Sequence, residues 1–157
     1  MLEEILSDCA LEAHGKGCRL DLTVDAPIVV TGDRKLLHRA GENVLRNAIR
    51  HAPEGTAIDI ELRRTNGTAT IRVRDRGTGV PDDSLEQIFD PFFRIETDRS
   101  RSSGGVGLGL TITRRAVALH GGEAFATNAK PGLTVTIRLP LQKDAASHDA
   151  PIPCATA

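Results

Sequence analysis

Apolar and polar residues alternate along several short segments of this chain, and this pattern predicts strands. Successive side chains of a strand point to opposite faces of a sheet, so each strand has one apolar side. Asn66 and Gly67 separate two such segments and are a strong signal for a hairpin turn. The predicted strands comprise residues 19–24, 57–64, 68–75, 123–128 and 133–139.

Three further segments have the apolar spacing of amphipathic helices, namely residues 2–13, 34–52 and 108–120. Asp33 is placed to cap the second of these helices, and Pro53 ends it. Gly121 and Gly122 end the third helix. Helices and strands in this order predict an α/β fold, a two-layer sandwich with helices on one face of a mixed, mostly antiparallel sheet.

Length and composition indicate one domain with a single core. The chain has 157 residues, of which 39% are hydrophobic. The predicted domain covers residues 1–141, and the small, polar residues 142–157 are predicted to form a disordered tail. The formal net charge of -1 argues against nucleic acid as a partner.

The cysteines exclude two classes of small protein. Cys9, Cys18 and Cys154 are odd in number and lack the spacing of a zinc site or a disulfide framework.

No apolar run approaches the roughly 20 residues that span a bilayer.

The second predicted helix has an unusual polar strip. At about 100° per residue, Asn43, Asn47, Arg50 and His51 share one side of it. Asparagine is a poor helix former, its amide oxygen is a suitable Mg²⁺ ligand, and arginine binds phosphate. Taken alone, the strip is equally consistent with a solvated helix face.

Asp75 is predicted to point into the core, because it shares one side of its strand with Ile71 and Val73. A buried carboxylate needs a hydrogen-bond donor, and a ligand amino group is one candidate. Gly77 and Gly79 would let the backbone or a ligand approach closely. The alternative is that Asp75 caps local N–H groups at the end of the strand.

A glycine-rich run, residues 104–110, leads into the third helix. Free N–H groups at a helix start form an anion site, although a run of this kind can also be a flexible hinge. It is neither a P-loop nor a dinucleotide fingerprint, because it lacks their residues and spacing.

Four segments in order resemble the N, G1, F and G2 boxes of bacterial sensor histidine kinases. They are residues 42–48, 75–79, 89–94 and 105–110. The resemblance covers residues 2–141 and implies the Bergerat ATP-binding fold, an α/β sandwich. It also implies ATP and Mg²⁺ as ligands.

The resemblance implies a role for each box. Asn43 and Asn47 would hold Mg²⁺ and phosphates, and Asp75 would accept a hydrogen bond from the adenine amino group. Gly77 and Gly79 would bring their loop close to the base. The other implied nucleotide contacts are Arg50, His51 (often Tyr in the family), Arg94 in a mobile lid over residues 94–103, and the backbone of Gly105, Val106, Gly107, Leu108, Gly109 and Leu110.

The same motifs favour a kinase over a hydrolase. ATPases with this fold carry a glutamate one turn before the metal-binding asparagine, where this chain has Asn43. Glu42 lies roughly 140° around the helix from Asn47. The segment Phe89–Arg94 argues against anti-sigma serine kinases. A stand-alone ATPase and a degenerate, non-catalytic module are the alternatives.

No histidine of the chain resembles a phosphate acceptor, which is a histidine before an acidic residue on a long helix. His14 and His120 lie near helix ends, where a cation suits the helix dipole. The five histidines are His14, His38, His51, His120 and His148.

The acceptor is therefore expected on the dimerisation helices of a longer parent protein, with a response regulator as the next partner. No residue of this chain would be catalytic beyond positioning ATP, and the chain alone is expected to be monomeric. The resemblance implies a cytoplasmic domain of an inner-membrane parent.

Overall fold

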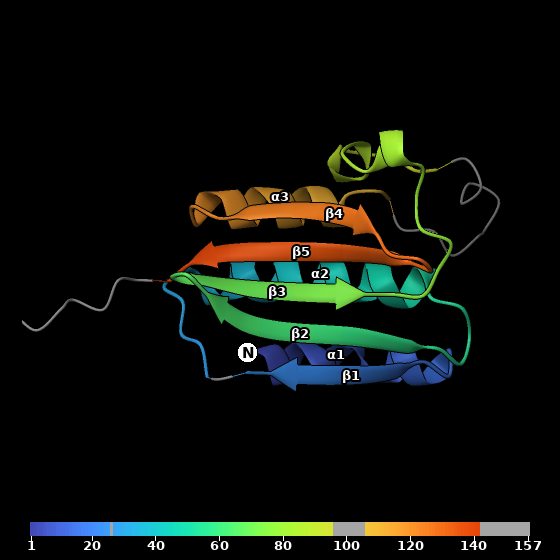
Figure 1. Ribbon diagram of the computed structural model, residues 1–157, viewed down its shortest axis with the longest axis horizontal. Coiled ribbons are helices and arrows are strands. Elements are labelled where there is room, and N and C mark those ends of the chain that lie inside the picture. The colour runs from blue at the N-terminus through green and yellow to red at the C-terminus, as the bar shows by residue number, and fades with distance from the viewer. Residues whose placement is uncertain (26, 96–105, 142–157) are drawn as a thin grey trace, which may run out of the picture.

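A computed structural model describes residues 1–25, 27–95 and 106–141. Helices cover one face of a five-stranded sheet, as Figure 1 shows. The elements are α1 (Leu2–Gly15), β1 (Arg19–Val24), α2 (Arg34–His51), β2 (Ala57–Thr65), β3 (Thr68–Arg74), the 3-10 turns η1 (Asp82–Ser84) and η2 (Gln87–Phe89), α3 (Gly109–Leu119), β4 (Glu123–Asn128) and β5 (Leu133–Pro140).

The strands lie in the order β1-β2-β3-β5-β4. β1 and β2 are parallel, and every other pair is antiparallel. Asn66 and Gly67 turn the β2–β3 hairpin with φ angles of 48° and 75°. The predicted two-layer sandwich is confirmed, and the predicted strands and helices begin and end within two residues of the observed ones.

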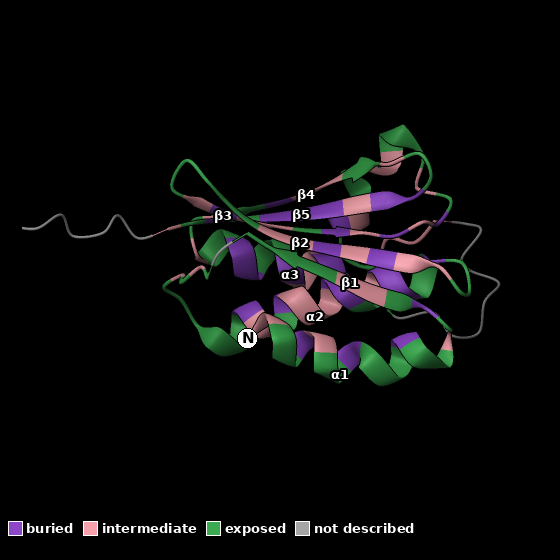
Figure 2. Cartoon of the chain, turned by 60° about the horizontal axis from the view of Figure 1, so that its bottom comes forward, coloured by how far each residue is buried: buried purple, intermediate pink, exposed green. Residues whose placement is uncertain are grey.

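The core lies between the helices and the inner face of the sheet, where the buried parts of the elements face one another (Figure 2). α1 contributes Ile5, Cys9 and Ala13, which recur at helical spacing. Burying one large aliphatic side chain contributes about 1.5–3 kcal/mol. The largest fully buried side chains are Leu45, Ile49, Ile58, Ile60, Val44, Val117, Thr113 and Cys9.

Polar contacts fix the start of α2 and join it to α3. The Asp33 carboxylate accepts hydrogen bonds from the backbone N–H groups of Lys35 and Leu36, at 2.8 and 3.0 Å, as predicted for an N-cap. The Thr113 hydroxyl donates to the carbonyl oxygen of Ala40 at 3.1 Å. The bond from Thr113 joins α3 to α2, whereas the bonds of Asp33 fix the start of α2.

His120 lies at the end of α3, near a helix end as expected, and also makes a tertiary contact. Its Nε2 accepts the backbone N–H of Asp33 at 2.9 Å. Its Nδ1 lies 2.6 Å from the Ala116 carbonyl oxygen. The ring therefore joins the end of α3 to the start of α2.

The segments with candidate chemistry gather at one end of the sheet. β3 and β4 end there and β5 begins there, at the right of Figure 1, where α2 also ends. This end lies opposite the hairpin turn at Asn66 and Gly67. In the described part of the chain, no helix is both long and apolar enough to cross a membrane.

Candidate functional site

Asp75 follows the last residue of β3 and is buried, with 3% of its surface exposed. Its Oδ1 accepts hydrogen bonds from the backbone N–H groups of Gly77, at 2.8 Å, and Leu133, at 3.2 Å. The predicted inward orientation is confirmed, and the local capping role that was its alternative is present as well. Both bonds end on Oδ1, so Oδ2 can accept a bond from a bound molecule.

Burial raises the pKa of the Asp75 carboxyl group, because desolvation disfavours the charged form. The backbone N–H groups of Gly77 and Leu133 and the nearby His51 offset part of this rise in the pKa. Among the described residues, the hydrogen bonds to the carboxylate come from neutral backbone donors, and His51 adds an electrostatic contribution. A further neutral donor such as an amino group suits it.

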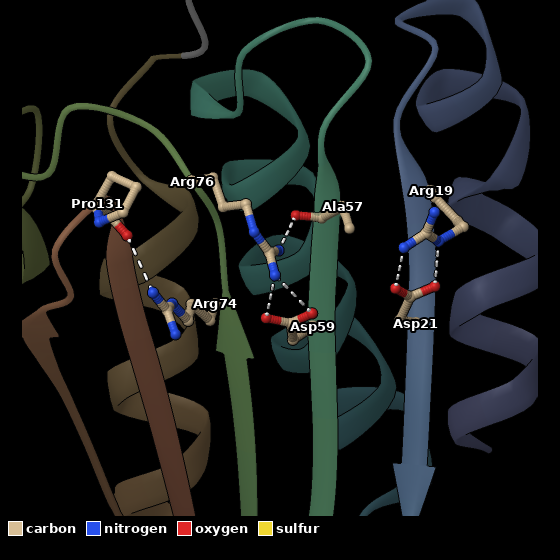
Figure 3. Close-up of polar contacts among 7 residues, drawn as sticks. All are labelled: Arg19, Asp21, Ala57, Asp59, Arg74, Arg76 and Pro131. Carbon is tan, nitrogen blue, oxygen red and sulfur yellow. Dashed lines mark hydrogen bonds and ion pairs between the residues drawn. The ribbon is translucent and has the colours of Figure 1, made fainter.

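The arginines beside Asp75 point away from it, as strand alternation predicts. Figure 3 shows Arg74 and Arg76 on the face of the sheet away from the helices. Arg76 binds the Asp59 carboxylate at 3.0 Å and the carbonyl oxygen of Ala57. Arg74 donates to a carbonyl oxygen in the β4–β5 turn at 3.4 Å. Neither guanidinium is engaged with Asp75.

Close contacts within the protein require glycine at positions 77 and 79, so the approach of a ligand is not needed to explain these residues. A Cβ on Gly77 would lie 2.6 Å from the His51 carbonyl oxygen. Gly79 has a φ of 71°, and its Cβ would lie 2.6 Å from Oδ1 of Asn128. The loop after β3 is therefore pressed between the end of α2 and the end of β4.

Asn128 and Gly132 support this site, and the sequence analysis missed both. The Asn128 amide bonds to the backbone of Val80. Gly132 has a φ of 103°, and a Cβ there would overlap the carbonyl oxygen of Asp75. Asn128 ends β4 and Gly132 precedes β5, and in the sequence both carried only the ordinary signal of a turn.

The polar strip of α2 is partly enclosed. Asn43 and Asn47 are half-buried, whereas Arg50 and His51 are exposed. The Nδ2 atom of Asn43 is buried and has no hydrogen-bond partner among the described residues. A buried amide without a partner is costly, so a bound group that accepts a hydrogen bond from Nδ2 would stabilise it.

The glycine-rich run lies against Asn43. A Cβ on Gly109, the first residue of α3, would be 3.7 Å from the Asn43 Oδ1 atom. The residue before the helix, Leu108, provides no side-chain cap, so the first N–H groups of α3 have no such acceptor. Leu110 is buried, Val106 is 69% exposed, and Gly105 lies outside the described residues.

The phenylalanine segment holds the start of this run. The N–H of Phe92 donates to the carbonyl oxygen of Gly107 at 3.0 Å, and Gly107 has a φ of 77°. Phe89 is buried beneath the guanidinium of Arg114, 5.3 Å from the ring centroid. Arg94 is half-buried, and residues 96–103 of the predicted lid lie outside the described residues.

Residues 32–143 match the model of the family described as histidine kinase-, DNA gyrase B-, and HSP90-like ATPases. The chain belongs to this family. Family membership supports ATP binding by the site described above.

The similar proteins are sensor histidine kinases. The chain is 39% identical to the sensor-like histidine kinase SenX3 of Mycolicibacterium smegmatis over 133 residues, covering 83% of this chain and 35% of SenX3. It is 40% identical to the sensor protein PfeS of Pseudomonas aeruginosa, covering 88% of this chain and 30% of PfeS. The chain thus spans about a third of the length of these relatives.

A solved structure of the mycobacterial sensor histidine kinase MprB has the same fold. It is 31% identical, with a TM-score of 0.76, covering 88% of this chain and 91% of that one. This chain is therefore a catalytic domain of the histidine kinase type.

The donor set is compatible with Mg²⁺ bound together with phosphate. No group of three or more His, Cys, Asp or Glu side chains among the described residues could hold a metal ion. A metal would therefore rely on the amide oxygens of Asn43 and Asn47, and Mg²⁺ accepts such a site because it keeps several waters and binds phosphate oxygens. The buried, unpartnered Nδ2 of Asn43 is a donor and suits a phosphate oxygen rather than the metal itself.

Glu42 is occupied elsewhere. Its carboxylate binds Arg46 at 2.9 Å, and Arg46 lies 3.6 Å from Glu12 of α1. Glu42 therefore faces α1 rather than the strip that contains Asn47.

Two hollows occur elsewhere in the structure. One, of about 760 Å³, is an open depression on the outer face of the sheet around Arg63, Arg72 and Arg138. The other, of about 160 Å³, is an apolar cavity between the helices and the sheet. Neither includes Asp75 or Asn43, so the candidate site rests on polar atoms and backbone geometry.

Proposed function

We propose that this domain binds Mg²⁺–ATP and donates the γ-phosphoryl group to a histidine on the dimerisation helices of a sensor kinase. The phosphoryl group then passes to an aspartate of a response regulator. The observation that carries the proposal is Asp75, a buried carboxylate held at Oδ1 by two backbone N–H groups. Its Oδ2 atom suits the amino group of adenine.

The remaining residues have roles along the nucleotide. Asn43 and Asn47 hold Mg²⁺ and phosphate oxygens, while Arg50, His51 and Arg94 bind on the phosphate and sugar side. Mg²⁺, when bound, neutralises charge on the phosphates. The backbone from Gly105 to Leu110 provides N–H groups at the start of α3.

Phosphoryl transfer is favoured over hydrolysis because no carboxylate of α2 is placed to activate water. Glu42 pairs with Arg46 instead. Transfer requires mainly positioning and charge neutralisation, which this site can provide.

The proposed partners are the dimerisation helices of the parent protein and a response regulator. We propose that the parent lies in the inner membrane with this domain in the cytoplasm, and that the domain alone is monomeric. Residues 1–141 form the functional unit of this proposal, and the predicted tail, residues 142–157, lies outside the described residues.

Titration calorimetry of ATP and ADP, with and without Mg²⁺, tests the proposal. We expect micromolar binding, on the order of -6 to -8 kcal/mol, weakened when EDTA removes Mg²⁺. A parallel assay with γ-labelled ATP should show neither self-labelling nor sustained phosphate release. No binding would refute the proposal, self-labelling would place the acceptor in this chain, and steady turnover would favour a stand-alone ATPase.

A further inference from the structure

The loop that follows Asp75 is held at both ends by side-chain hydrogen bonds. At its start, Oδ1 of Asp75 accepts the N–H of Gly77 at 2.8 Å. At its far end, the side chain of Asn128 reaches across from the end of β4 to Val80. These two residues are 48 positions apart in the chain.

Both the oxygen and the nitrogen of the Asn128 side-chain amide form hydrogen bonds with the backbone of Val80. Its Oδ1 accepts the N–H of Val80 at 3.0 Å, and its Nδ2 donates to the carbonyl oxygen of Val80 at 2.7 Å. The same Nδ2 donates to Oδ1 of Asp82 at 2.8 Å. The side chain therefore pairs with Val80 much as a neighbouring strand would, although β3 ended six residues earlier.

Gly79 shows how closely Asn128 approaches the loop. A Cβ at position 79 would lie 2.6 Å from Oδ1 of Asn128 and 3.2 Å from the Gly132 carbonyl oxygen. The backbone of the loop is thus packed directly on the amide group. Any other side chain at position 128 would lose the bonds, the contact or both.

We propose that Asn128 is a positioning residue for nucleotide binding, which holds the loop 77–82 in the conformation that adenine requires. This inference rests on the proposed role of Asp75 in binding the adenine amino group. Without Asn128 the far end of the loop loses its side-chain hydrogen bonds, and the nucleotide must order it on binding. The three hydrogen bonds of Asn128 are exposed, so each contributes at the low end of the usual range, and their loss corresponds to about a tenfold rise in Kd.

A set of four variants separates positioning from general stability. Asn128→Ala removes the anchor, and Thr127→Ala changes the exposed neighbour on the same strand as a matched control. Asn128→Asp keeps an acceptor for Val80 but brings a carboxylate against Asp82. Adding Asp82→Asn returns an amide donor to that pair and should restore much of the lost affinity.

Calorimetry with Mg²⁺–ATP and thermal unfolding are measured for the wild type and each variant. We expect Asn128→Ala and Asn128→Asp to raise Kd about tenfold with little change in Tm, Thr127→Ala to match the wild type, and the double variant to recover. In the absence of nucleotide, amide hydrogen exchange at Val80 should become faster in Asn128→Ala.

The outcomes distinguish this inference from the proposed function. A wild type that binds ATP, together with an Asn128→Ala variant of unchanged Kd, would overturn the positioning role alone. A failure of the double variant to recover affinity would also count against it. A wild type that does not bind ATP would overturn the proposed function and this inference with it.

Discussion

Replacement of Asp75 by asparagine should change nucleotide binding and stability in different ways. The Oδ1 atom of asparagine can still accept from Gly77 and Leu133, the two N–H groups that Asp75 satisfies in the structure. The other end of the side chain changes from an acceptor, Oδ2, to an NH₂ donor. In the proposed complex it would face the adenine amino group, which is also a donor.

The size of each effect follows from this geometry. A hydrogen bond to a charged group contributes about 1.5–3 kcal/mol, so Asp75→Asn should raise the Kd for ATP about 10- to 150-fold. The free energy of unfolding should change by less than about 1 kcal/mol, because both backbone bonds remain. A small gain at neutral pH is expected, since burial already raises the pKa of Asp75 and disfavours its charged form.

Asp75→Ala is the matched control. It leaves the N–H groups of Gly77 and Leu133 without an acceptor and should lower the free energy of unfolding by about 2–4 kcal/mol. Calorimetric titration with Mg²⁺–ATP and urea unfolding at pH 7 measure the two quantities on the same three proteins.

Two results would refute this reasoning. Unchanged ATP affinity in Asp75→Asn would mean that the carboxylate does not bind the base. An asparagine variant as unstable as the alanine variant would mean that the charge of Asp75, rather than its acceptor, holds the loop.

Three further predictions concern pH, metal and backbone. Because the pKa of Asp75 is raised, protonation should weaken ATP binding as the pH falls through that pKa, and Asp75→Asn should not show this pH dependence. The effect of Asp75 on the free energy of unfolding has the opposite sign. Its favourable contribution is full below the ordinary carboxyl pKa of 3.8 and is lost as the pH rises through the raised pKa. Urea unfolding across pH 3–7 should show this loss. Asn43→Ala should remove most of the effect of Mg²⁺ on the ATP affinity measured by calorimetry. It should cost less than about 1 kcal/mol of stability, because Nδ2 of Asn43 has no partner among the described residues. An unchanged Mg²⁺ effect would exclude Asn43 as a ligand. Gly132→Ala should lower stability by about 3 kcal/mol or more in thermal unfolding, because its Cβ would overlap the Asp75 carbonyl oxygen. The control Gly55→Ala, at a φ of 75° but in open space, should cost about 1–2 kcal/mol. Equal losses in the two variants would contradict the overlap.

Local patterns in the sequence determined most of the fold. Strand alternation and helix spacing depend on neighbouring residues, so they predicted the elements and the inward side of Asp75. The Asp33 cap and the turn at Asn66 and Gly67 are likewise short-range features. The order of the four boxes then pointed to the family that the comparisons show.

Only the tertiary structure decided which distant groups meet at the site. The bond from Asn128 to Val80 joins residues 48 positions apart, and the bond between Asp33 and His120 spans 87 positions. No local pattern encodes such contacts, so the bond from Asp33 to His120 and the bonds from Asn128 to Val80 could not be predicted. The reason that Gly79 is glycine likewise appeared only when β4 was placed beside the loop, because its steric constraint comes from an atom of another strand.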